Sequence, residues 1–514
     1  MAHTRGLFAL GLALALALTA CGDTRLGAEG LSGDPVGAWD SQRLVAEVGA
    51  DQLPLLGLSG DDALVVAISE QGTILSHLST GGSPFEAGQP FKTDLGYVQL
   101  GGVGRLPDGN WFTLGSGGMV GNGGDTELAF EPVAFRSADG LAWEQVEVTG
   151  FAHPVDVNDL EVLEDGTLVA AGTYRTAADP GNGGFEAHVW TSADAASFAP
   201  VDLPGVQTPR GYDNESYVGH LAVTSDRLLA AGRVDRSAAV WTSDDEARTW
   251  QRASDPDLDD VYDISGLAAV GDVVLAGVGE GSVTALRSTD QGATWAPADG
   301  LPVAGMEGSW APVWADQDRF WTLTGIDDMS WSRPEVCYAD LDQCGRDLAP
   351  RLVTSPDGSG WTAADMPVEP DAIAGTADGR VLVVGMDSDG AVVVHTLAAG
   401  TSPPEAPAIA EPETVELVTL EEGETPEVGV RYHAPMYVHC GMTWFYFGDT
   451  TWRRTDNGPG VETGAGDQAP EGWPLVGQVL YGYATLTDTD ELEYSLDDET
   501  IATYRRADGA PGCD

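Results

Sequence analysis

Short apolar segments recur along residues 63–385, and each is preceded by a polar turn that often contains Asp-Gly. Most of the copies are followed by glycine. Apolar runs of this length, bounded by turn residues, predict strands buried on both faces, and the Asp-Gly pairs predict hairpins. Helical spacing of apolar residues is nearly absent, so the pattern predicts an all-β protein. The seven copies occupy residues 63–68, 110–115, 167–172, 227–232, 272–277, 319–325 and 380–385.

A second pattern, a Ser-x-Asp turn followed by an aromatic residue, runs in phase with these strands. Counted from one serine to the next, its copies are 58, 55, 51, 45 and 67 residues apart. Each unit then contains a strand, a turn, the apolar strand, an outer strand, the Ser-x-Asp turn and an edge strand. Four strands in about 50 residues, repeated, predict the blades of a β-propeller. The copies begin at Ser79, which opens a degenerate one, and at Ser137, Ser192, Ser243, Ser288 and Ser355.

The number of blades follows from comparing the two patterns. Seven apolar strands but only six turns leave one blade incomplete. We therefore predict a seven-bladed propeller over residues 36–399, with a six-bladed one as the alternative. The last blade has no such turn after residues 392–397, and we expect its missing outer strand to come from the N-terminal segment near residues 43–48.

The Ser-x-Asp turns have a structural explanation. A serine and an aspartate two residues later can accept hydrogen bonds from the amides of their own turn. Glycine permits a positive φ, and the aromatic side chain is expected to fold over the turn and pack between sheets. The residues expected in this role are Ser137, Asp139 and Trp143; Ser192, Asp194 and Phe198; Ser243, Asp245 and Trp250; Ser288, Asp290, Gly292 and Trp295; and Ser355, Asp357 and Trp361.

The motif Ser-x-Asp-x-Gly-x-Thr-Trp resembles the Asp-box, or BNR repeat, of sialidase-like propellers. Residues 288–295 match it at every position, and residues 243–250 depart only at Ala247. The resemblance covers roughly residues 40–398 and implies the propeller fold. It implies no activity, because the Asp-box is a structural motif that stabilises hairpins on the outside of the blades. The arginines that precede two boxes, Arg136 and Arg287, are accordingly expected beside the turns and away from the central channel.

A catalytic sialidase is expected to carry an Arg-Ile-Pro segment, three arginines that grip the substrate carboxylate, a Tyr-Glu pair and an Asp acid/base. No Arg-Ile-Pro occurs in this chain. The most polar and aromatic loop of the predicted propeller, residues 209–217, supplies weak catalytic candidates, and Arg233 and Arg236 could join them. The alternative is that Arg210 pairs with nearby acids in an ordinary loop. The loop candidates are Arg210, Tyr212, Glu215 and Tyr217.

The N-terminus predicts export and lipid anchoring. Arg5 precedes an apolar segment at residues 7–18, and Leu-Thr-Ala then leads to Cys21. This resembles the lipobox of bacterial lipoproteins, with a signal peptide at residues 1–20 and lipidation of Cys21. The mature chain would be extracytoplasmic and membrane-anchored, with residues 21–35 as a flexible tether. An ordinary secretory signal is the alternative.

A second domain is predicted beyond the propeller. Residues 400–414 form an acidic, proline-rich linker, and residues 415–514 contain strand-like segments typical of a small β-sandwich or barrel. Four cysteines remain besides Cys21, and an oxidising compartment favours the disulfides Cys337–Cys344 and Cys440–Cys513. Free thiols or a metal site are the alternatives, although no Cys-x-x-Cys spacing supports a metal.

The net charge of −57 narrows the choice of partners. It argues against nucleic acid, whose phosphates are bound by Lys and Arg, and against direct adhesion to anionic lipid headgroups. The segment with Asp255, Asp257 and Asp259 resembles the first half of a calcium loop. It lacks the Gly and Glu that an EF-hand requires, so a solvated loop or an adventitious ion is expected. No cofactor fingerprint occurs, so no cofactor is expected.

These patterns favour a surface-anchored, non-catalytic propeller that binds an unknown protein or glycan or acts as an assembly scaffold. Its ligand is expected at the channel mouth or on the loops at residues 173–185 and 205–217. The alternative is a diverged, exo-sialidase-like glycoside hydrolase or another carbohydrate-active enzyme with its site in the channel. That alternative needs two carboxylates, or a tyrosine and a carboxylate, meeting in the channel. An assembly factor, like the Asp-box propellers that help build photosynthetic complexes, is a third possibility.

Overall fold

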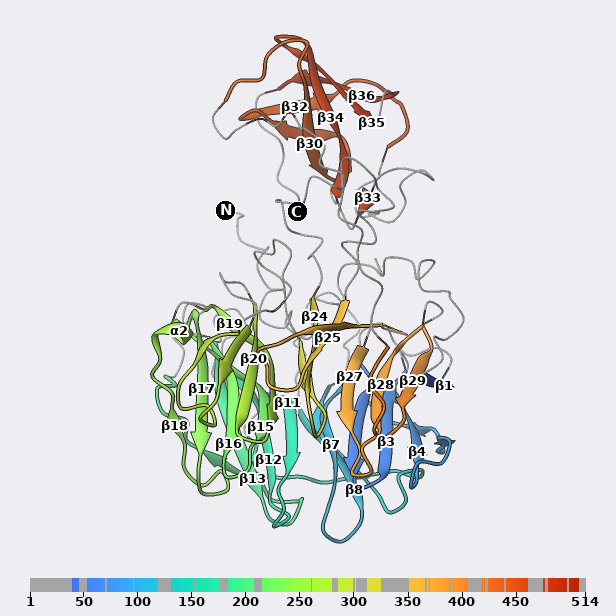
Figure 1. The fold of residues 1–514 in the computed structure, drawn as a ribbon, viewed down its shortest axis with the longest axis vertical. Coiled ribbons are helices and arrows are strands. Elements are labelled where there is room, and N and C mark those ends of the chain that lie inside the picture. The colour runs from blue at the N-terminus through green and yellow to red at the C-terminus, as the bar shows by residue number, and fades with distance from the viewer. Residues whose placement is uncertain are drawn as a thin grey trace.

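The computed structural model consists almost entirely of antiparallel sheets arranged around a common axis, followed by one further sheet (Figure 1). Among the described residues the only helix is α2 (Pro256–Asp259), and none is long and apolar enough to cross a membrane. The structure describes residues 39–45, 53–69, 72–95, 97–118, 131–151, 154–175, 184–207, 215–259, 261–279, 285–298, 301, 312–324, 351–365, 368, 370–387, 390–404, 418, 420, 424–438, 441–460, 475–476, 479–496 and 499–507.

Five of the sheets are consecutive units of the predicted repeat. The first contains β2 (Leu55–Ser59), β3 (Asp62–Ile68), β4 (Thr73–Ser79), β5 (Glu86–Ala87) and β6 (Phe91–Lys92). The second contains β7 (Tyr97–Arg105), β8 (Trp111–Gly118), β9 (Glu131–Ser137) and β10 (Glu144–Val146). The third contains β11 (Val155–Val162), β12 (Leu168–Arg175), β13 (Phe185–Ser192) and β14 (Ala199–Val201). The fourth contains β15 (Ser216–Val223), β16 (Leu228–Val234), β17 (Ser237–Ser243) and β18 (Gln251–Arg252). The fifth contains β19 (Asp263–Val270), β20 (Val273–Gly279), β21 (Ala285–Ser288) and β22 (Ala296–Pro297).

An eight-stranded sheet supplies the rest of the circle and divides into two four-stranded runs, joined by a single parallel bridge between Ala315 and Ala374. One run contains β23 (Val313–Ala315), β24 (Phe320–Thr324), β25 (Arg351–Ser355) and β26 (Thr362–Ala364). The other contains β27 (Pro370–Gly375), β28 (Val381–Met386), β29 (Val392–Leu397) and β1 (Trp39–Val45).

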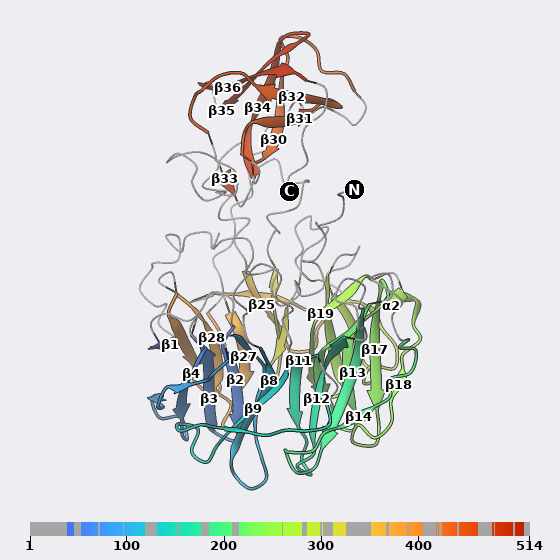
Figure 2. The same cartoon turned by 180° about the vertical axis from the view of Figure 1, so that it is seen from behind.

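The first strands of the units form a closed inner ring. Each contacts the next, from β2 through β7, β11, β15, β19 and β23 to β27, and β27 contacts β2. In Figures 1 and 2 the blue strands of the first unit accordingly lie beside the orange strands of the last. The fold is therefore the all-β propeller that the repeats predicted, whereas the number of its blades stays a prediction.

Strand β1 closes the circle. It pairs antiparallel with β29, from Trp39 opposite Leu397 to Val45 opposite Val392. This confirms that the N-terminal segment completes the last unit, although the strand begins at Trp39 and not at Arg43. The Gln42 side chain donates to the Phe85 carbonyl and accepts from the Phe85 amide, both at 2.8 Å. Because Phe85 belongs to the first unit, β1 fastens the last unit to the first.

The apolar strands form the core between neighbouring units. Every residue of β8, β16 and β28 is buried. Core clusters combine adjacent units, as where Leu64 and Val66 of the first pack with Trp111 and Phe135 of the second. Each fully buried side chain of this size contributes about 1.5–3 kcal/mol, so the units are held together mainly by these faces.

Bulges in the inner strands explain the glycine that follows the apolar strands. The register of β11 shifts at Asn158, which brings the Asp156 carbonyl over β12. A Cβ on Gly172 would lie 2.0 Å from that oxygen. The same relation holds at Gly115, 1.9 Å from the Gln99 oxygen, and at Gly232, 2.2 Å from the Tyr217 oxygen. Glycine is required at these positions for space, because the carbonyl of the inner strand occupies the place of a side chain. Matching register shifts occur at Gly101, Gly219, Ser265 and Asp371.

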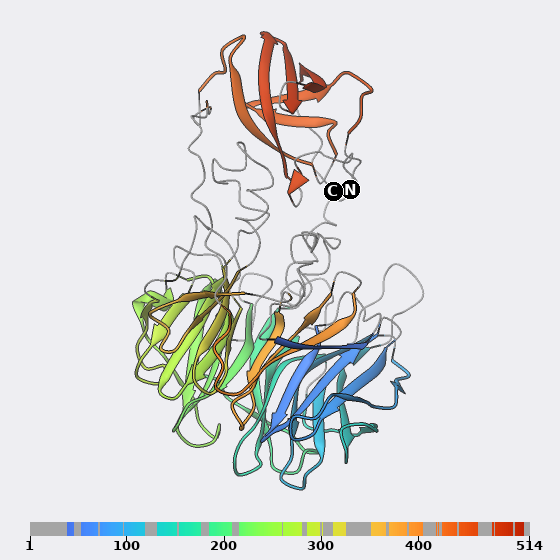
Figure 3. The same cartoon turned by 45° about the vertical axis from the view of Figure 1, so that its right-hand side comes forward.

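The C-terminal sheet is separate in the fold drawing (Figure 3). Its strands are β30 (Arg431–Tyr437), β31 (Trp444–Phe447), β32 (Thr450–Arg454), β33 (Leu475–Val476), β34 (Val479–Asp488), β35 (Glu491–Leu496) and β36 (Glu499–Arg506), in the order β30-β34-β35-β36-β32-β31 with β33 beside β34. Strands β30 and β31 at its two ends contact each other, so the sheet curls around an apolar core that includes Trp452 and Tyr494. This is the small all-β unit expected beyond the linker. The sequence did not predict β35.

Candidate functional site

The Ser-x-Asp turns share one geometry, which residues 288–294 illustrate. The Ser288 hydroxyl donates to Asp290 Oδ1 at 2.8 Å and accepts the Gly292 amide at 2.8 Å. Asp290 also accepts the Thr294 amide at 2.8 Å and the Thr294 hydroxyl at 2.7 Å. Equivalent bonds begin at Ser137, Ser192, Ser243 and Ser355. These are the bonds to the turn's own amides that the sequence led us to expect.

The glycine position of the turns faces the preceding unit. A Cβ on Gly292 would lie 2.4 Å from Leu229 Cδ2, and one on Gly140 would lie 3.4 Å from Leu64 Cδ1. Ala195 and Ala247 occupy the same position in two turns and adopt φ of 56° and 63°. An L-residue in this left-handed region costs about 1–2 kcal/mol. Both alanines are buried, so the methyl groups fill space that glycine would leave empty.

The degenerate turn at Ser79 obtains its carboxylate from elsewhere. Asp62, at the start of β3, accepts the Gly81 amide at 3.0 Å. The same side chain binds Arg105 of the next unit at 2.8 Å. A carboxylate therefore serves this turn too, although it does not come from the turn itself.

The carboxylates of the turns are committed to structure. Hydrogen bonds from the Ala142 and Leu141 amides lower the pKa of Asp139 below its usual value, and bonds to the Ser359 amide and hydroxyl do so for Asp357. These acids therefore stay ionised and bound to their turns at neutral pH. Two arginines near the turns are also engaged: Arg136 pairs with Asp108, and Arg287 donates to the Asp357 carbonyl of the next unit at 2.7 Å.

Titratable groups gather on the inner strands. Strand β11 carries Asp156, Asp159 and Glu161, all partly buried. Asp159 accepts the Leu160 amide and, from the next inner strand, the Leu221 amide, both at 2.7 Å. Burial raises the pKa of Asp159 to about 6, although these bonds oppose the shift. Burial, reinforced by the charge of Asp159, raises the pKa of Glu161 to about 8.

A second cluster joins the fourth and fifth units and contains two of the predicted catalytic candidates. The Arg233 guanidinium lies 5.4 Å from the Tyr217 ring centre and 4.9 Å from that of Tyr262. It donates to the Tyr262 hydroxyl at 2.9 Å and lies 3.7 Å from Glu215. Burial, together with the neighbouring carboxylate of Asp263, raises the pKa of Tyr217 well above its usual value. Tyr217 is therefore neutral at physiological pH, because ionisation would add a second negative charge beside Asp263.

The remaining site predictions concern a weak metal site and residues that the structure does not describe. Asp255 accepts the Asp257 amide at 3.0 Å and the Trp295 amide at 2.9 Å, so its carboxylate connects the start of α2 to the next unit. No group of three or more His, Cys, Asp or Glu side chains suited to a metal occurs in the described part of the chain. The predictions for Arg210, Tyr212, Cys21, Cys337, Cys344, Cys440 and Cys513 lie outside the described residues, as does the side chain of Asp259.

Three histidines on the third strands of their units, His77, His188 and His395, serve the packing of those units. Burial lowers the pKa of His395 to about 4, and its Nδ1 lies 2.7 Å from the Ser41 hydroxyl of β1. Burial also lowers the pKa of His77 in β4, which forms a hydrogen bond with the backbone of Leu44 in β1. His188 stacks on Trp190 and contacts the tilted ring of Tyr174. Two of the three histidines therefore hold β1 in place.

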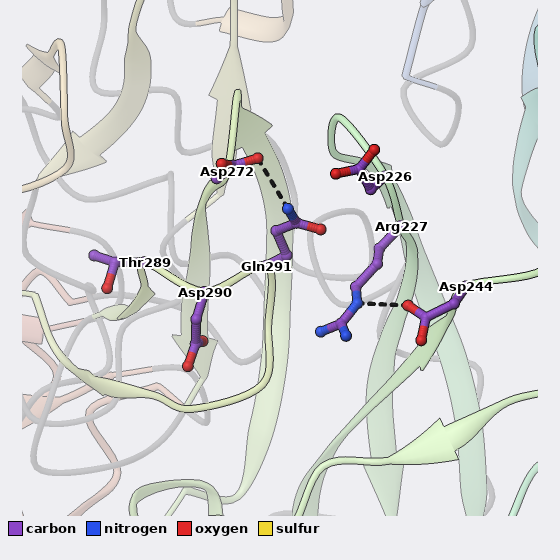
Figure 4. Close-up of a pocket in the computed structure, with 7 residues that line it drawn as sticks. All are labelled: Asp226, Arg227, Asp244, Asp272, Thr289, Asp290 and Gln291. Carbon is purple, nitrogen blue, oxygen red and sulfur yellow. Dashed lines mark hydrogen bonds and ion pairs between the residues drawn. The ribbon is translucent and has the colours of Figure 1, made fainter.

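An open depression of about 560 Å³ lies where β15 turns into β16 and β19 turns into β20 (Figure 4). It is formed by turns of the fourth and fifth units. Arg227 donates to Asp244 at 2.5 Å, and Gln291 donates to Asp272 at 3.0 Å. Each of these two bonds connects side chains of one unit, and the depression lies between the turns of the fourth and fifth units. Its lining residues are Asp226, Arg227, Asp244, Asp272, Thr289, Asp290 and Gln291.

Sequence reasoning missed the acids of β11 and Tyr262, the partner of Arg233 that directly precedes β19. The segment Val155–Val162 has three acids among alternating apolar residues, which was a readable signal of a strand with one polar face. The pairing of Arg233 with Tyr262 depended on the order of units around the ring, which local patterns do not give.

Comparisons with known proteins concern the fold alone. No family model matches the chain, and no curated protein matches it. Solved structures that resemble it include YCF48 bound to a D1 peptide, with 11% identity, 71% of this chain and 98% of that chain covered, and a TM-score of 0.41. A chain of a mitotic checkpoint complex has 15% identity, coverage of 70% and 95%, and a TM-score of 0.42. An ulvan lyase of polysaccharide lyase family PL25 has 12% identity, coverage of 69% and 95%, and a TM-score of 0.41.

Proposed function

We propose that this protein is a surface-anchored, non-catalytic propeller of the sialidase-like Asp-box type that binds a protein or glycan or serves as an assembly scaffold. One observation carries the proposal: two charged groups near the inner strands, Asp159 and Arg233, are bound to neighbouring units. Asp159 binds the Leu221 amide of the next unit, and Arg233 binds Tyr262 of the next unit. Groups used in this way fasten the ring and are not free to act on a substrate.

The anchoring part of the proposal rests on the N-terminal sequence. Lipidation at Cys21 would leave a short tether before β1, which begins at Trp39. The propeller would then be held close to the membrane by the strand that closes its ring. Mass spectrometry of the membrane fraction tests this, because a lipidated Cys21 would be the first residue of the mature chain.

A diverged glycoside hydrolase or other carbohydrate-active enzyme is the second candidate, and the carboxyl pair on β11 favours it. Asp159 and Glu161 lie two residues apart, which places their Cα atoms roughly 7 Å from each other along the strand. A carboxylic acid that keeps its proton at neutral pH, beside a carboxylate, is the combination that a general acid and its partner need. Burial gives Glu161 a pKa of about 8, so it is the group that carries this proton.

The two candidates are separated by assaying the same preparation for binding and for turnover. The full chain is incubated with neutral and acidic polysaccharides while new reducing ends and unsaturated uronate products are measured, and in parallel it is applied to a glycan array and used in a pull-down. Retention of a glycan or protein without product supports the non-catalytic proposal. Turnover that Glu161→Gln abolishes, and that the exposed Glu164→Gln leaves intact, contradicts it and establishes the enzyme.

A further inference from the structure

The C-terminal sheet presents two aromatic side chains on the outside of an end strand. In β31 the alternate residues Phe445 and Phe447 are buried in the core, so Trp444 and Tyr446 point outward. Tyr446 is 67% exposed, the largest fraction of any large hydrophobic side chain in the described part of the chain. Its hydroxyl lies 3.4 Å from Asp449 in the adjoining turn, which leaves the ring face open.

An arginine lies directly beside these rings. Arg453 of β32 pairs in register with Trp444, and its guanidinium lies 5.6 Å from the Trp444 ring centre. On its other side Arg453 is opposite Arg505 of β36, which in turn is opposite Glu491 of β35 and binds it at 2.6 Å. Arg453 is exposed and forms no ion pair within the described residues.

This arrangement is electrostatically incomplete. Like charges directly opposite each other across strands are destabilising, and Glu491 balances only one of the two arginines. An anionic group placed over Arg453 would remove the imbalance.

The shape of the patch identifies the kind of partner. Two outward residues of one strand have Cα atoms roughly 7 Å apart, a spacing that suits successive sugar rings lying along the strand. The exposed area of two aromatic side chains falls far short of the roughly 800 Å² per partner that a specific protein interface buries. A polysaccharide needs only ring faces for its C–H surfaces and a cation for its acidic groups.

We propose that Trp444, Tyr446 and Arg453 bind an anionic polysaccharide, with sugar rings on the two aromatic faces and a carboxylate or sulfate ester on the guanidinium. The site belongs to the C-terminal sheet, so it does not depend on the function proposed for the propeller. It gives this small domain a role in attaching the protein to an acidic matrix.

Affinity electrophoresis of the full chain tests the proposal, with polygalacturonate, dextran sulfate or neutral dextran cast into the gel. We expect retardation by at least one anionic polymer and none by dextran. The apparent Kd should rise at least tenfold in Arg453→Gln and in the double variant Trp444→Ala/Tyr446→Ala. The preference between polygalacturonate and dextran sulfate identifies the acidic group as carboxylate or sulfate.

The matched control is Arg506→Gln, which removes an equal charge from the next residue of β36 after Arg505. This variant should bind like the original chain, and circular dichroism should show that all variants are folded. Equal losses in Arg506→Gln and Arg453→Gln would mean general charge attraction and would overturn the proposal. Full binding by the aromatic double variant, absence of retardation in every gel, or equally effective competition by polyglutamate would also overturn it.

Discussion

Replacing Glu161 by Gln should make the propeller more stable at alkaline pH and leave it nearly unchanged at acidic pH. The glutamate lies on inner strand β11 beside Asp159, and burial raises its pKa to about 8 from an ordinary value of 4.5. Between these two pH values the folded state holds a proton that the unfolded state has released. The free energy of unfolding therefore falls as the pH rises through this interval. Glutamine keeps the shape of the protonated acid and cannot ionise.

The size of the effect follows from the width of the interval. Each unit of pKa difference corresponds to about 1.4 kcal/mol, so complete burial would give about 5 kcal/mol at pH 9. Because the side chain is partly accessible, we expect about 2–5 kcal/mol at pH 9 and close to zero at pH 4.5.

Urea unfolding of both proteins between pH 4.5 and 9, followed by tryptophan fluorescence, measures the difference. The control is Glu164→Gln in the exposed turn that follows β11, which should shift the midpoint equally at all pH values. A Glu161→Gln protein that is less stable than the original at pH 9, or that differs from it by the same amount at every pH, would refute the reasoning.

Three other predictions follow from the same structure. Gly172→Ala should lower the free energy of unfolding by about 3 kcal/mol, because its Cβ would lie 2.0 Å from the Asp156 carbonyl oxygen. The control is Gly360→Ala, whose Cβ would have no atom within 4 Å and which should change the free energy of unfolding by less than about 1 kcal/mol. Thermal unfolding of both variants measures the difference. Gln42→Ala should cost about 1–3 kcal/mol and speed hydrogen exchange in β29, since it removes both bonds to Phe85; unchanged exchange would show that β1 is held without them. Stability should fall as the pH drops from about 6.5 to about 4, because the unfolded state then protonates His395 while the folded state, in which burial lowers its pKa to about 4, does not. His395→Gln should make that fall shallower in acid titrations followed by circular dichroism.

The propeller could be predicted because its repeats are local. Apolar segments such as residues 227–232 and turns such as residues 288–295 contain their own hydrogen-bonding and packing requirements, so each copy could be recognised without knowing its neighbours. The closing strand was also predictable, because one unit lacked a partner. Its exact start was not, since Trp39 is fixed by contacts with residues more than 300 positions away in the chain.

The candidate site was harder to predict because its partners come from different units. Glu215 and Tyr217 could be proposed from their loop, but Tyr262 and Asp263 reach them only because β15 and β19 are adjacent in the ring. The glycines that follow the apolar segments were visible in the sequence, but the pattern did not show why glycine is needed there. The cause seen at Gly115, Gly172 and Gly232, a carbonyl of the bulged inner strand above the glycine, requires the register of two strands to be known. Strand β35 was missed because its alternating acids made it look like a solvated loop.

The pairing of β1 with β29 has a mechanical consequence. Trp39 lies opposite Leu397, so the chain that leads into β1 and the chain that leaves β29 depart from the same end of the strand pair. Tension between the two ends of the protein would open this ladder one residue pair at a time, as a zipper opens, instead of shearing all its hydrogen bonds at once. The ring, although its core holds the units together, would therefore open at a low force applied through its termini.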